Sequence, residues 1–156
     1  MLKTPRQLNP VVELIDELVR LNGRLKSIFS GVNASTGLSP MDATVLTAVV
    51  ESHVAPTVPQ IGRSLGNPRQ VIQRSANSLI SAGLIETAPN PNHKRAPLLI
   101  ATRQGKNLKH KADTLAVEMT SELLLIINAG KCRRIASEIR ELRSQIEDYL
   151  RSIKAK

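Results

Sequence analysis

Residues 67–85 read NPRQVIQRSANSLISAGLI, and this stretch carries the signals of a helix that ends in a tight turn. Asn67 is a favoured N-cap residue, and Pro68 suits the first helical position, where its missing N–H costs nothing. Gln70 follows the cap by three residues, as in a capping box. Gly83 supplies a residue that can adopt the left-handed conformation at which helices stop. The stretch therefore predicts a helix from Asn67 to just before Gly83.

The predicted helix has two unlike faces. At 100° per residue, one side carries Val71, Ile72, Ser75, Ala76 and Leu79. The other side carries Arg69, Gln70, Gln73, Arg74 and Asn77, with no carboxylate. Arg, Gln and Asn side chains form paired hydrogen bonds to guanine and adenine edges and also bind phosphates. Taken alone, this face fits a nucleic-acid contact and an ordinary solvated surface equally well.

The charge of the chain is concentrated in its central part. The 156 residues carry a formal net charge of +9, yet residues 1–62 hold five basic and five acidic side chains. Residues 63–111 hold nine basic side chains and one acidic one, and residues 112–156 hold eight and seven. A localised positive field is what a polyanionic partner requires, whereas charge carried only for solubility would not cluster.

Aromatic residues are too few for two of the possible anionic partners. Phe29 and Tyr149 are the only ones in the chain. Single-stranded nucleic acid is bound by base stacking on aromatic side chains, and basic membrane-surface helices use aromatic anchors. The longest apolar run, Leu123–Ile127, is far below the ~18 residues of a membrane span. Duplex DNA is therefore the partner that the composition favours, and no membrane association is expected.

Cysteine and histidine usage gives no sign of catalysis or metal binding. Cys132 is the single cysteine, so no internal disulfide can form, and we expect a reducing, cytoplasmic location. Asp16 and Glu17 interrupt any signal-peptide core near the N-terminus. The three histidines, His53, His93 and His110, lack metal-ligand spacing with the cysteine. With no catalytic motif present either, we expect neither an enzyme nor a cofactor.

Two further helices are predicted before residue 67, after a long N-terminal one. Apolar residues at heptad spacing predict a helix over residues 10–32: Val11, Leu14, Leu18, Leu21, Leu25, Ile28 and Val32. The glycine-containing segment 31–37 should break it. Ser39 and Pro40 begin a second helix, whose predicted inward residues are Val45, Leu46, Val49 and Val50. Thr57 and Gln60 form a capping box for a short helix that stops at Gly66, which makes a helix-turn-helix with the helix after it.

The residues after Gly83 read as two strands and a basic loop. Residues 84–87 and 97–101 have strand character, and residues 88–96 hold two prolines and two asparagines, as turns do. The tip carries His93, Lys94 and Arg95. A basic hairpin after a helix-turn-helix fits the narrow minor groove of DNA, whose negative potential attracts arginine. The alternative is an ordinary solvated hairpin.

Two amphipathic helices complete the chain. Their apolar stripes are larger than the helix-turn-helix and its hairpin can cover. Thr102 should cap the first, whose apolar face comprises Leu108, Ala112, Leu115, Met119, Leu123 and Ile126 before a break at residues 128–130. The last carries Ile135, Ile139, Leu142, Ile146, Tyr149 and Ile153 at alternating steps of four and three. We expect these residues and Val11, Leu14 and Leu18 to form a homodimer interface. The alternative is that the terminal helices pack only on each other.

The order of these elements and several motifs resemble the MarR family of winged helix-turn-helix regulators. The pattern Arg74, Leu79, Gly83, Leu84 and Ile85 is similar to that family's, as is the wing segment Asn90–Arg95 followed by Pro97, Leu98, Thr102 and Gly105. The resemblance implies a mainly α fold with a small antiparallel β wing. Its domains would be an N-terminal dimerisation helix (residues 1–35), a DNA-binding domain (36–101) and C-terminal dimerisation helices (102–156).

The same resemblance implies the function and its residues. It identifies Arg95 as the minor-groove arginine, while His93 stands where the family has an acid. It implies a homodimer that binds palindromic operators in double-stranded DNA, regulates transcription, usually as a repressor, and releases DNA on binding a small anionic effector. Cys132 does not match the family's oxidant-sensing position. The predicted DNA-binding set is Asn67, Pro68, Arg69, Gln70, Gln73, Arg74, Asn77, His93, Lys94 and Arg95. A non-specific architectural protein and a winged-helix interaction module are the alternatives.

Overall fold

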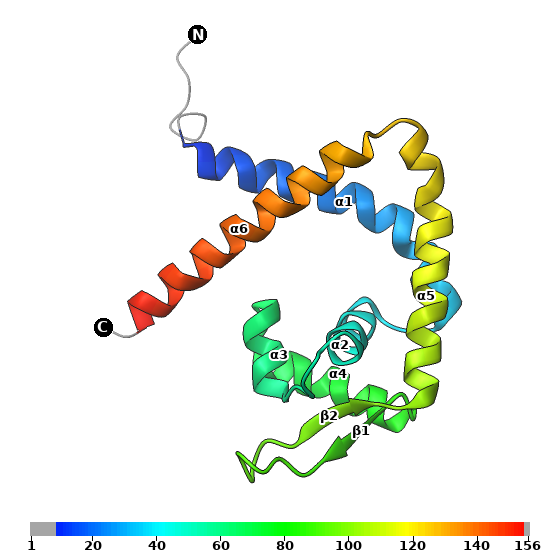
Figure 1. The fold of residues 1–156 in the computed structure, drawn as a ribbon, viewed down its shortest axis with the longest axis vertical. Coiled ribbons are helices and arrows are strands. Elements are labelled where there is room, and N and C mark those ends of the chain that lie inside the picture. The colour runs from blue at the N-terminus through cyan, green and yellow to red at the C-terminus, as the bar shows by residue number, and fades with distance from the viewer. Residues whose placement is uncertain (1–8, 155–156) are drawn as a thin grey trace. The chain divides into compact units, whose positions relative to one another are not determined.

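The computed structural model of the chain describes residues 9–154 (Figure 1). The chain divides into two compact units, with the boundary in the sequence between Val117 and Glu118. The elements are α1 (Pro10–Thr36), α2 (Pro40–Val50), α3 (Val58–Leu65), α4 (Arg69–Ser81), β1 (Ile85–Ala88), β2 (Leu98–Ala101), α5 (Arg103–Ser121), a 3₁₀ helix (Glu122–Leu125) and α6 (Ala129–Lys154). The predicted fold class, mainly helical with one small antiparallel sheet, is confirmed.

The core of the first unit lies between α2, α3, α4 and the sheet, which Figure 1 shows grouped together. Its largest fully buried side chains are Leu46, Ile72, Leu79, Ile85, Leu99 and Val45. The predicted inward residues of α2 are confirmed, because Val45, Leu46 and Val49 are buried and Val50 is half-buried. Ile72, Ala76 and Leu79 bring the apolar face of α4 into the same core.

Helix α1 continues beyond its predicted end. We expected residues 31–37 to break it, but the helix passes through Gly31 and reaches Thr36. A glycine inside a helix costs only about 0.5–1 kcal/mol relative to alanine, which a helix of 27 residues tolerates. Gly37, with φ of 68°, is the residue that leaves the helical conformation.

Two left-handed glycines end α3 and α4 in the same way. Gly66 has φ of 64°, and Asn67 N–H donates to the carbonyl of Gly62 at 2.9 Å. Gly83 has φ of 70°, and Leu84 N–H donates to the carbonyl of Leu79 at 2.9 Å. Each is a Schellman arrangement, in which the six-residue hydrogen bond satisfies a carbonyl at the helix end. The predicted roles of both glycines are confirmed.

The predicted start of α4 is wrong by one residue, and its capping box is absent. Pro68, with ψ of 139°, is the N-cap, and its carbonyl accepts from the N–H groups of Val71 and Ile72. No side chain caps this helix, so Gln70 has no capping role. Asn67 instead donates its side-chain amide to the carbonyl of Leu65 at 3.0 Å. Because Asn67 completes the end of α3, it does not begin α4.

The capping of α2, α3 and α5 agrees with the sequence. Ser39 Oγ accepts from the N–H of Asp42, and Thr57 and Gln60 form the complete capping box. Thr102 Oγ1 accepts from Gly105 N–H at 3.0 Å and donates to the carbonyl of Gly83 at 2.7 Å. Thr102 thus fastens the start of α5 to the turn that ends α4.

The sheet is a two-stranded hairpin held on the helices. β1 and β2 pair antiparallel, with Ile85 opposite Ala101 and Ala88 opposite Leu98. The N–H of Leu99 also donates to the carbonyl of Pro56 at 2.8 Å, which joins β2 to the segment before α3. We call β1, β2 and residues 89–97 between them the wing.

The second unit differs from the prediction at its beginning. We expected one helix to include Leu123 and Ile126, but α5 ends at Ser121 and a 3₁₀ helix follows. Asn128 begins α6 by accepting from the N–H of Lys131 at 2.9 Å, so the preceding helix must stop before it. The run 123–127 is apolar at every position, which gives a helix no polar side to turn to solvent. No helix among the described residues is long and apolar enough to cross a membrane.

Candidate nucleic-acid interface

Helix α4 presents the polar face that the sequence predicts. Arg69, Gln70, Gln73, Arg74 and Asn77 are all exposed, whereas Ile72, Ser75, Ala76 and Leu79 are buried. Gln73 Nε2 donates to Asn77 Oδ1 at 3.0 Å, so these two amides lie side by side on the surface. The exposed face offers guanidinium and amide groups that can bind base edges and phosphates.

One carboxylate holds α4 through residues outside its predicted DNA-reading face. It was not among the predicted site residues. Asp42, in the first turn of α2, accepts hydrogen bonds from the hydroxyls of Ser75 and Ser78 on α4. Ser75 is 4% exposed, and a buried hydroxyl requires such a partner. The signal was present in the sequence, because a serine on an otherwise apolar helix face predicts a polar group opposite it.

The wing is closed by Asn90, the first residue of the wing segment that resembles the family, although we predicted no structural role for its side chain. Its Nδ2 donates to the carbonyl of Ala96 at 2.8 Å, and its Oδ1 accepts from the N–H of Asn92 at 3.0 Å. The carbonyl of Asn90 accepts from His93 N–H at 3.2 Å. An asparagine that bonds the backbone two residues ahead is a common way to build a turn. These bonds determine the backbone that carries Lys94 and Arg95.

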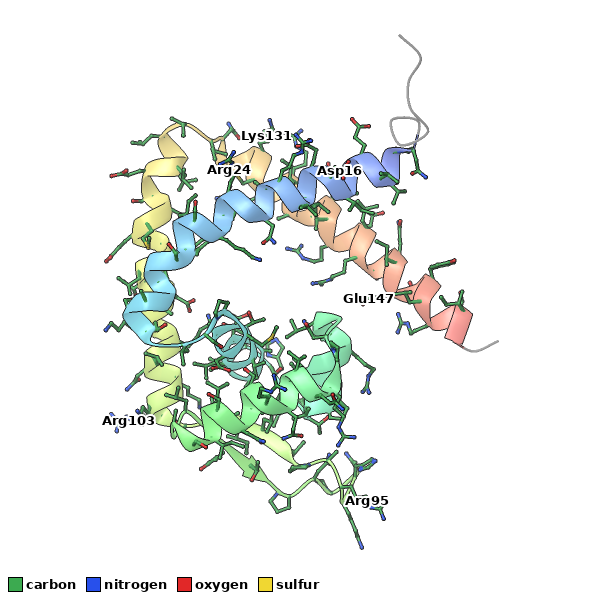
Figure 2. The ribbon with its side chains drawn as sticks, turned by 180° about the vertical axis from the view of Figure 1, so that it is seen from behind. Asp16, Arg24, Arg95, Arg103, Lys131 and Glu147 are labelled. Carbon is green, nitrogen blue, oxygen red and sulfur yellow. The ribbon has the colours of Figure 1, made fainter. Side chains whose placement is uncertain are left out.

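The basic side chains of the wing extend into solvent. His93, Lys94 and Arg95 are exposed, and Figure 2 shows Arg95 at the far end of the hairpin. Among residues 9–154, Arg95 has neither an ion pair nor a hydrogen bond from its side chain. Its guanidinium is thus available to a ligand outside the chain.

A hollow of about 570 Å³ lies between α3, the start of α4 and the wing. Its lining residues are Val54, Ala55, Thr57, Pro59, Gln60, Arg63, Arg69, Asn90, Asn92, His93, Arg95, Ala96 and Leu98. We call it the arginine hollow, because Arg63, Arg69 and Arg95 come to it from three different elements. Its described lining contains no aspartate or glutamate.

The structure brings some of the predicted residues together and leaves others apart. Arg69, His93 and Arg95 share the arginine hollow, and a neighbouring hollow of about 50 Å³ is lined by Arg69, Gln73 and Arg95. Gln70, Arg74, Asn77 and Lys94 line neither hollow. Asn67 and Pro68 form the turn before α4. Arg63 and Gln60 were missed as site residues, since they lie on α3, for which we predicted only a capping box and a stop at Gly66.

One of the nine basic residues in segment 63–111 is not available to contribute to a positive binding surface. Lys109 of α5 is 9% exposed and its Nζ contacts Glu51 Oε1 at 2.9 Å and Asp113 Oδ2 at 2.7 Å. Burial alone lowers the pKa of Lys109, but its hydrogen bonds to Asp113 and Glu51 and their charges hold the pKa above the ordinary lysine value. Lys109 therefore joins α5 to the end of α2 and does not face a partner.

The described residues contain no group of three or more His, Cys, Asp or Glu side chains placed to hold a metal ion. Cys132 is exposed near the start of α6.

Comparison with known proteins agrees with this geometry. A model of the MarR family matches residues 36–96, the segment from the end of α1 through the wing tip. An uncharacterized protein of Mycobacterium tuberculosis is 30% identical over 132 residues, which cover 85% of this chain and 91% of that protein.

Solved structures share the fold. The repressor CouR bound to a 23-mer DNA duplex has a TM-score of 0.73 and 21% identity, and the match covers 92% of this chain and 99% of that chain. CouR from Rhodococcus jostii RHA1 bound to p-coumaroyl-CoA has a TM-score of 0.68 and 19% identity, covering 83% and 88%. The family resemblance predicted from the wing and α4 is confirmed, and the chain belongs to the MarR family of winged-helix, DNA-binding transcriptional regulators.

Proposed function

We propose that the protein is a homodimeric repressor that binds a palindromic operator in double-stranded DNA. The observation that carries this proposal is the exposed, acid-free face of α4 next to a wing tip whose Arg95 has no side-chain partner among residues 9–154. Side chains of this kind read base edges in the major groove, which distinguishes all four base pairs. A binding surface for a protein partner would more often include acids or apolar groups at these positions.

In the proposed complex, Arg69, Gln70, Gln73, Arg74 and Asn77 enter the major groove and share base and phosphate contacts. Lys94 and Arg95 of the wing contact the minor groove and its phosphates, with His93 beside them. Asn67 and Pro68 bring the start of α4 to the backbone, where helix N-terminal N–H groups favour phosphate. The hydrogen bonds from Asp42 to α4 support this arrangement, because they hold the reading helix in one orientation.

The proposal of a dimer rests on apolar side chains that each unit leaves exposed. On α1, Val11 and Leu18 are 59% and 36% exposed. On α6, the residues Ile135, Leu142, Ile146, Tyr149 and Ile153 are exposed, and the predicted partners Leu14 and Ile139 are half-buried. Covering apolar surface contributes about 25 cal/mol per Å², so these stripes favour association with a second copy. Two-fold symmetry would place two copies of α4 about 34 Å apart, one turn of duplex.

We further propose a cytoplasmic protein whose repression is relieved by a small anionic effector. A transcriptional repressor named CouR was solved with duplex DNA, and CouR from Rhodococcus jostii RHA1 was solved with p-coumaroyl-CoA, so chains of this fold bind both classes of ligand. An effector releases DNA when it binds better to a dimer whose two α4 helices no longer match the half-sites.

Selection from random duplexes at two salt concentrations tests this proposal. Enrichment of a palindrome with half-sites one helical turn apart is the expected result, and light scattering should give the mass of two chains. Binding without an enriched motif would contradict sequence-specific regulation and support an architectural role. Absence of duplex binding at both salt concentrations would overturn the proposed function altogether.

A further inference from the structure

The arginine hollow places three like charges where nothing in the described chain neutralises them. Arg63 comes from α3, Arg69 from the first turn of α4 and Arg95 from the wing. Within residues 9–154, none of the three guanidiniums has an ion pair or a side-chain hydrogen bond. Bringing unpaired charges of one sign to one hollow costs free energy, which an anion bound among them would offset.

The neutral side chains of the hollow add donors to the arginines. Gln60 Oε1 accepts from the N–H of Thr57 at 2.7 Å and from the hydroxyl of Thr57 at 2.9 Å. The carbonyl oxygen of Gln60 is thus occupied, and its NH₂ group has no partner among the described residues. The hollow therefore offers donors to a ligand, which selects for acceptors such as phosphate oxygens.

The frame of the hollow is fixed by hydrogen bonds on both sides. The capping box holds the start of α3, and the N–H of Leu99 bonds to the carbonyl of Pro56 where the wing meets it. Asn90 holds the wing tip through Ala96 and Asn92. Apolar atoms of Val54, Ala55, Pro59, Ala96 and Leu98 form part of the lining. Walls of low polarity strengthen the field of charges that face a hollow.

We propose that the arginine hollow is a phosphate-binding site in which Arg63 is an essential contact. Guanidinium forks bind phosphate oxygens in pairs, and three of them can surround one tetrahedral group from different directions. At about 570 Å³ the hollow also has room for the sugar or other group that carries the phosphate. The phosphate has two possible sources: the backbone of bound duplex, in which case the inference rests on the proposed function, and a small phosphorylated ligand.

The first arm of the test measures DNA binding. Full-length protein, Arg63→Gln and the control Arg103→Gln are titrated onto a labelled duplex across a range of salt concentrations. Arg103 is exposed and lies near the end of α4 opposite to the wing tip, as Figure 2 shows. If a strand phosphate occupies the hollow, Arg63→Gln weakens binding about tenfold on every sequence and reduces the salt slope by about one. Arg103→Gln changes affinity less than threefold.

The second arm uses inorganic pyrophosphate and protein without DNA, followed by calorimetry. If a free ligand can occupy the hollow, wild type and Arg103→Gln bind pyrophosphate and Arg63→Gln binds it at least tenfold more weakly. Arg63→Lys keeps the charge without the fork and should recover only part of the affinity. Pyrophosphate should then also displace duplex more strongly than sodium chloride of equal ionic strength.

The two arms separate the sources and can overturn the inference. Arg63 dependence in the first arm alone assigns the hollow to the DNA strand, and dependence in the second assigns it to a free ligand. Equal behaviour of Arg63→Gln and Arg103→Gln in both arms, with unchanged melting temperatures, would overturn the phosphate site. Enrichment of an operator alongside that result would leave the proposed function standing, whereas absence of duplex binding would remove it and leave the pyrophosphate arm to decide.

Discussion

The winged module, which comprises α2, α3, α4 and the wing, buries its apolar residues, whereas the terminal helix α6 leaves many of its apolar residues exposed. In the module, Val45, Ile72 and Leu79 are completely buried by α2, α4 and the sheet. On α6, Ile146, Tyr149 and Ile153 remain 49–64% exposed despite a regular apolar spacing. A regular apolar stripe on a helix therefore does not by itself show which surface covers it. The module has the core of a self-sufficient domain, whereas the exposed stripe of α6 is the surface that the proposed dimer would cover.

Truncating one isoleucine in each region should separate the two cases, with the largest effect in the module. Ile72→Ala removes a fully buried side chain and should lower the free energy of unfolding by about 2–5 kcal/mol. Ile146→Ala, whose side chain is 55% exposed, should leave the module intact but weaken the proposed dimer, so that the unfolding midpoint of the variant rises less with protein concentration than that of the wild type. Urea unfolding at two protein concentrations measures both. Equal losses without any concentration dependence would contradict the division.

The next effect comes from a glycine at the joint between the module and α5. A Cβ on Gly105 would lie 2.0 Å from the carbonyl oxygen of Leu84, so Gly105→Ala forces the backbone to move. We expect a loss of about 1–3 kcal/mol in the free energy of unfolding. Gly23→Ala on α1 is the matched control, because nothing lies within 4 Å of its added methyl group. That variant should be neutral or stabilising, since alanine favours helix. A tolerated Gly105→Ala would show that α5 is free to shift.

What the sequence predicts well in the module are local signals. Ser39, Thr57, Thr102, Gly66 and Gly83 all take their predicted places, because a cap or a left-handed turn depends on a few neighbouring residues. The prediction of Asn67 as the N-cap of α4 was wrong because α3 ends where α4 begins, and the backbone N–H and side-chain amide of Asn67 bond to the end of α3. A cap cannot be assigned from one helix when another ends beside it.

The same distinction between local signals and the packing of separate elements applies to the candidate site. The exposed face of α4 was predictable, because a helix places residues by a fixed rotation of 100°. The arginine hollow was not predictable, because Arg63, Arg69 and Arg95 meet only after α3, α4 and the wing have packed. Asp42 was likewise not predictable as part of the site, because its bonds to Ser75 and Ser78 depend on how α2 crosses α4.

Within the module, the helix and the wing should contribute differently to DNA binding. Gln73→Ala removes an amide that can read a base edge, so it should reduce discrimination at particular base pairs by about 1–3 kcal/mol. Arg95→Gln should weaken binding on all sequences and flatten the salt slope, as loss of a phosphate contact does. Titrations on operator and scrambled duplex at several salt concentrations distinguish them. Equal loss on both duplexes for Gln73→Ala would contradict base reading by α4.

The smallest effect concerns the ion pairs that join α5 to α2. Lys109→Met keeps most of the apolar stem and removes the charge that contacts Glu51 and Asp113, so we expect a loss of about 1 kcal/mol in unfolding free energy. Lys106→Met, one turn earlier and exposed, is the control and should change little.

The pH dependence of that difference identifies its origin. Burial lowers the pKa of Lys109, but hydrogen bonds and charge from Asp113 and Glu51 outweigh burial and raise the pKa above its ordinary value. A group with a raised folded-state pKa stabilises fully below its unfolded pKa and loses that contribution as the pH rises through the folded pKa. The difference between wild type and Lys109→Met should therefore be constant near neutral pH and shrink as the solution becomes strongly alkaline. A difference that shrinks between pH values of about 6 and 8 would assign the effect to a histidine instead, because only that side chain normally titrates there.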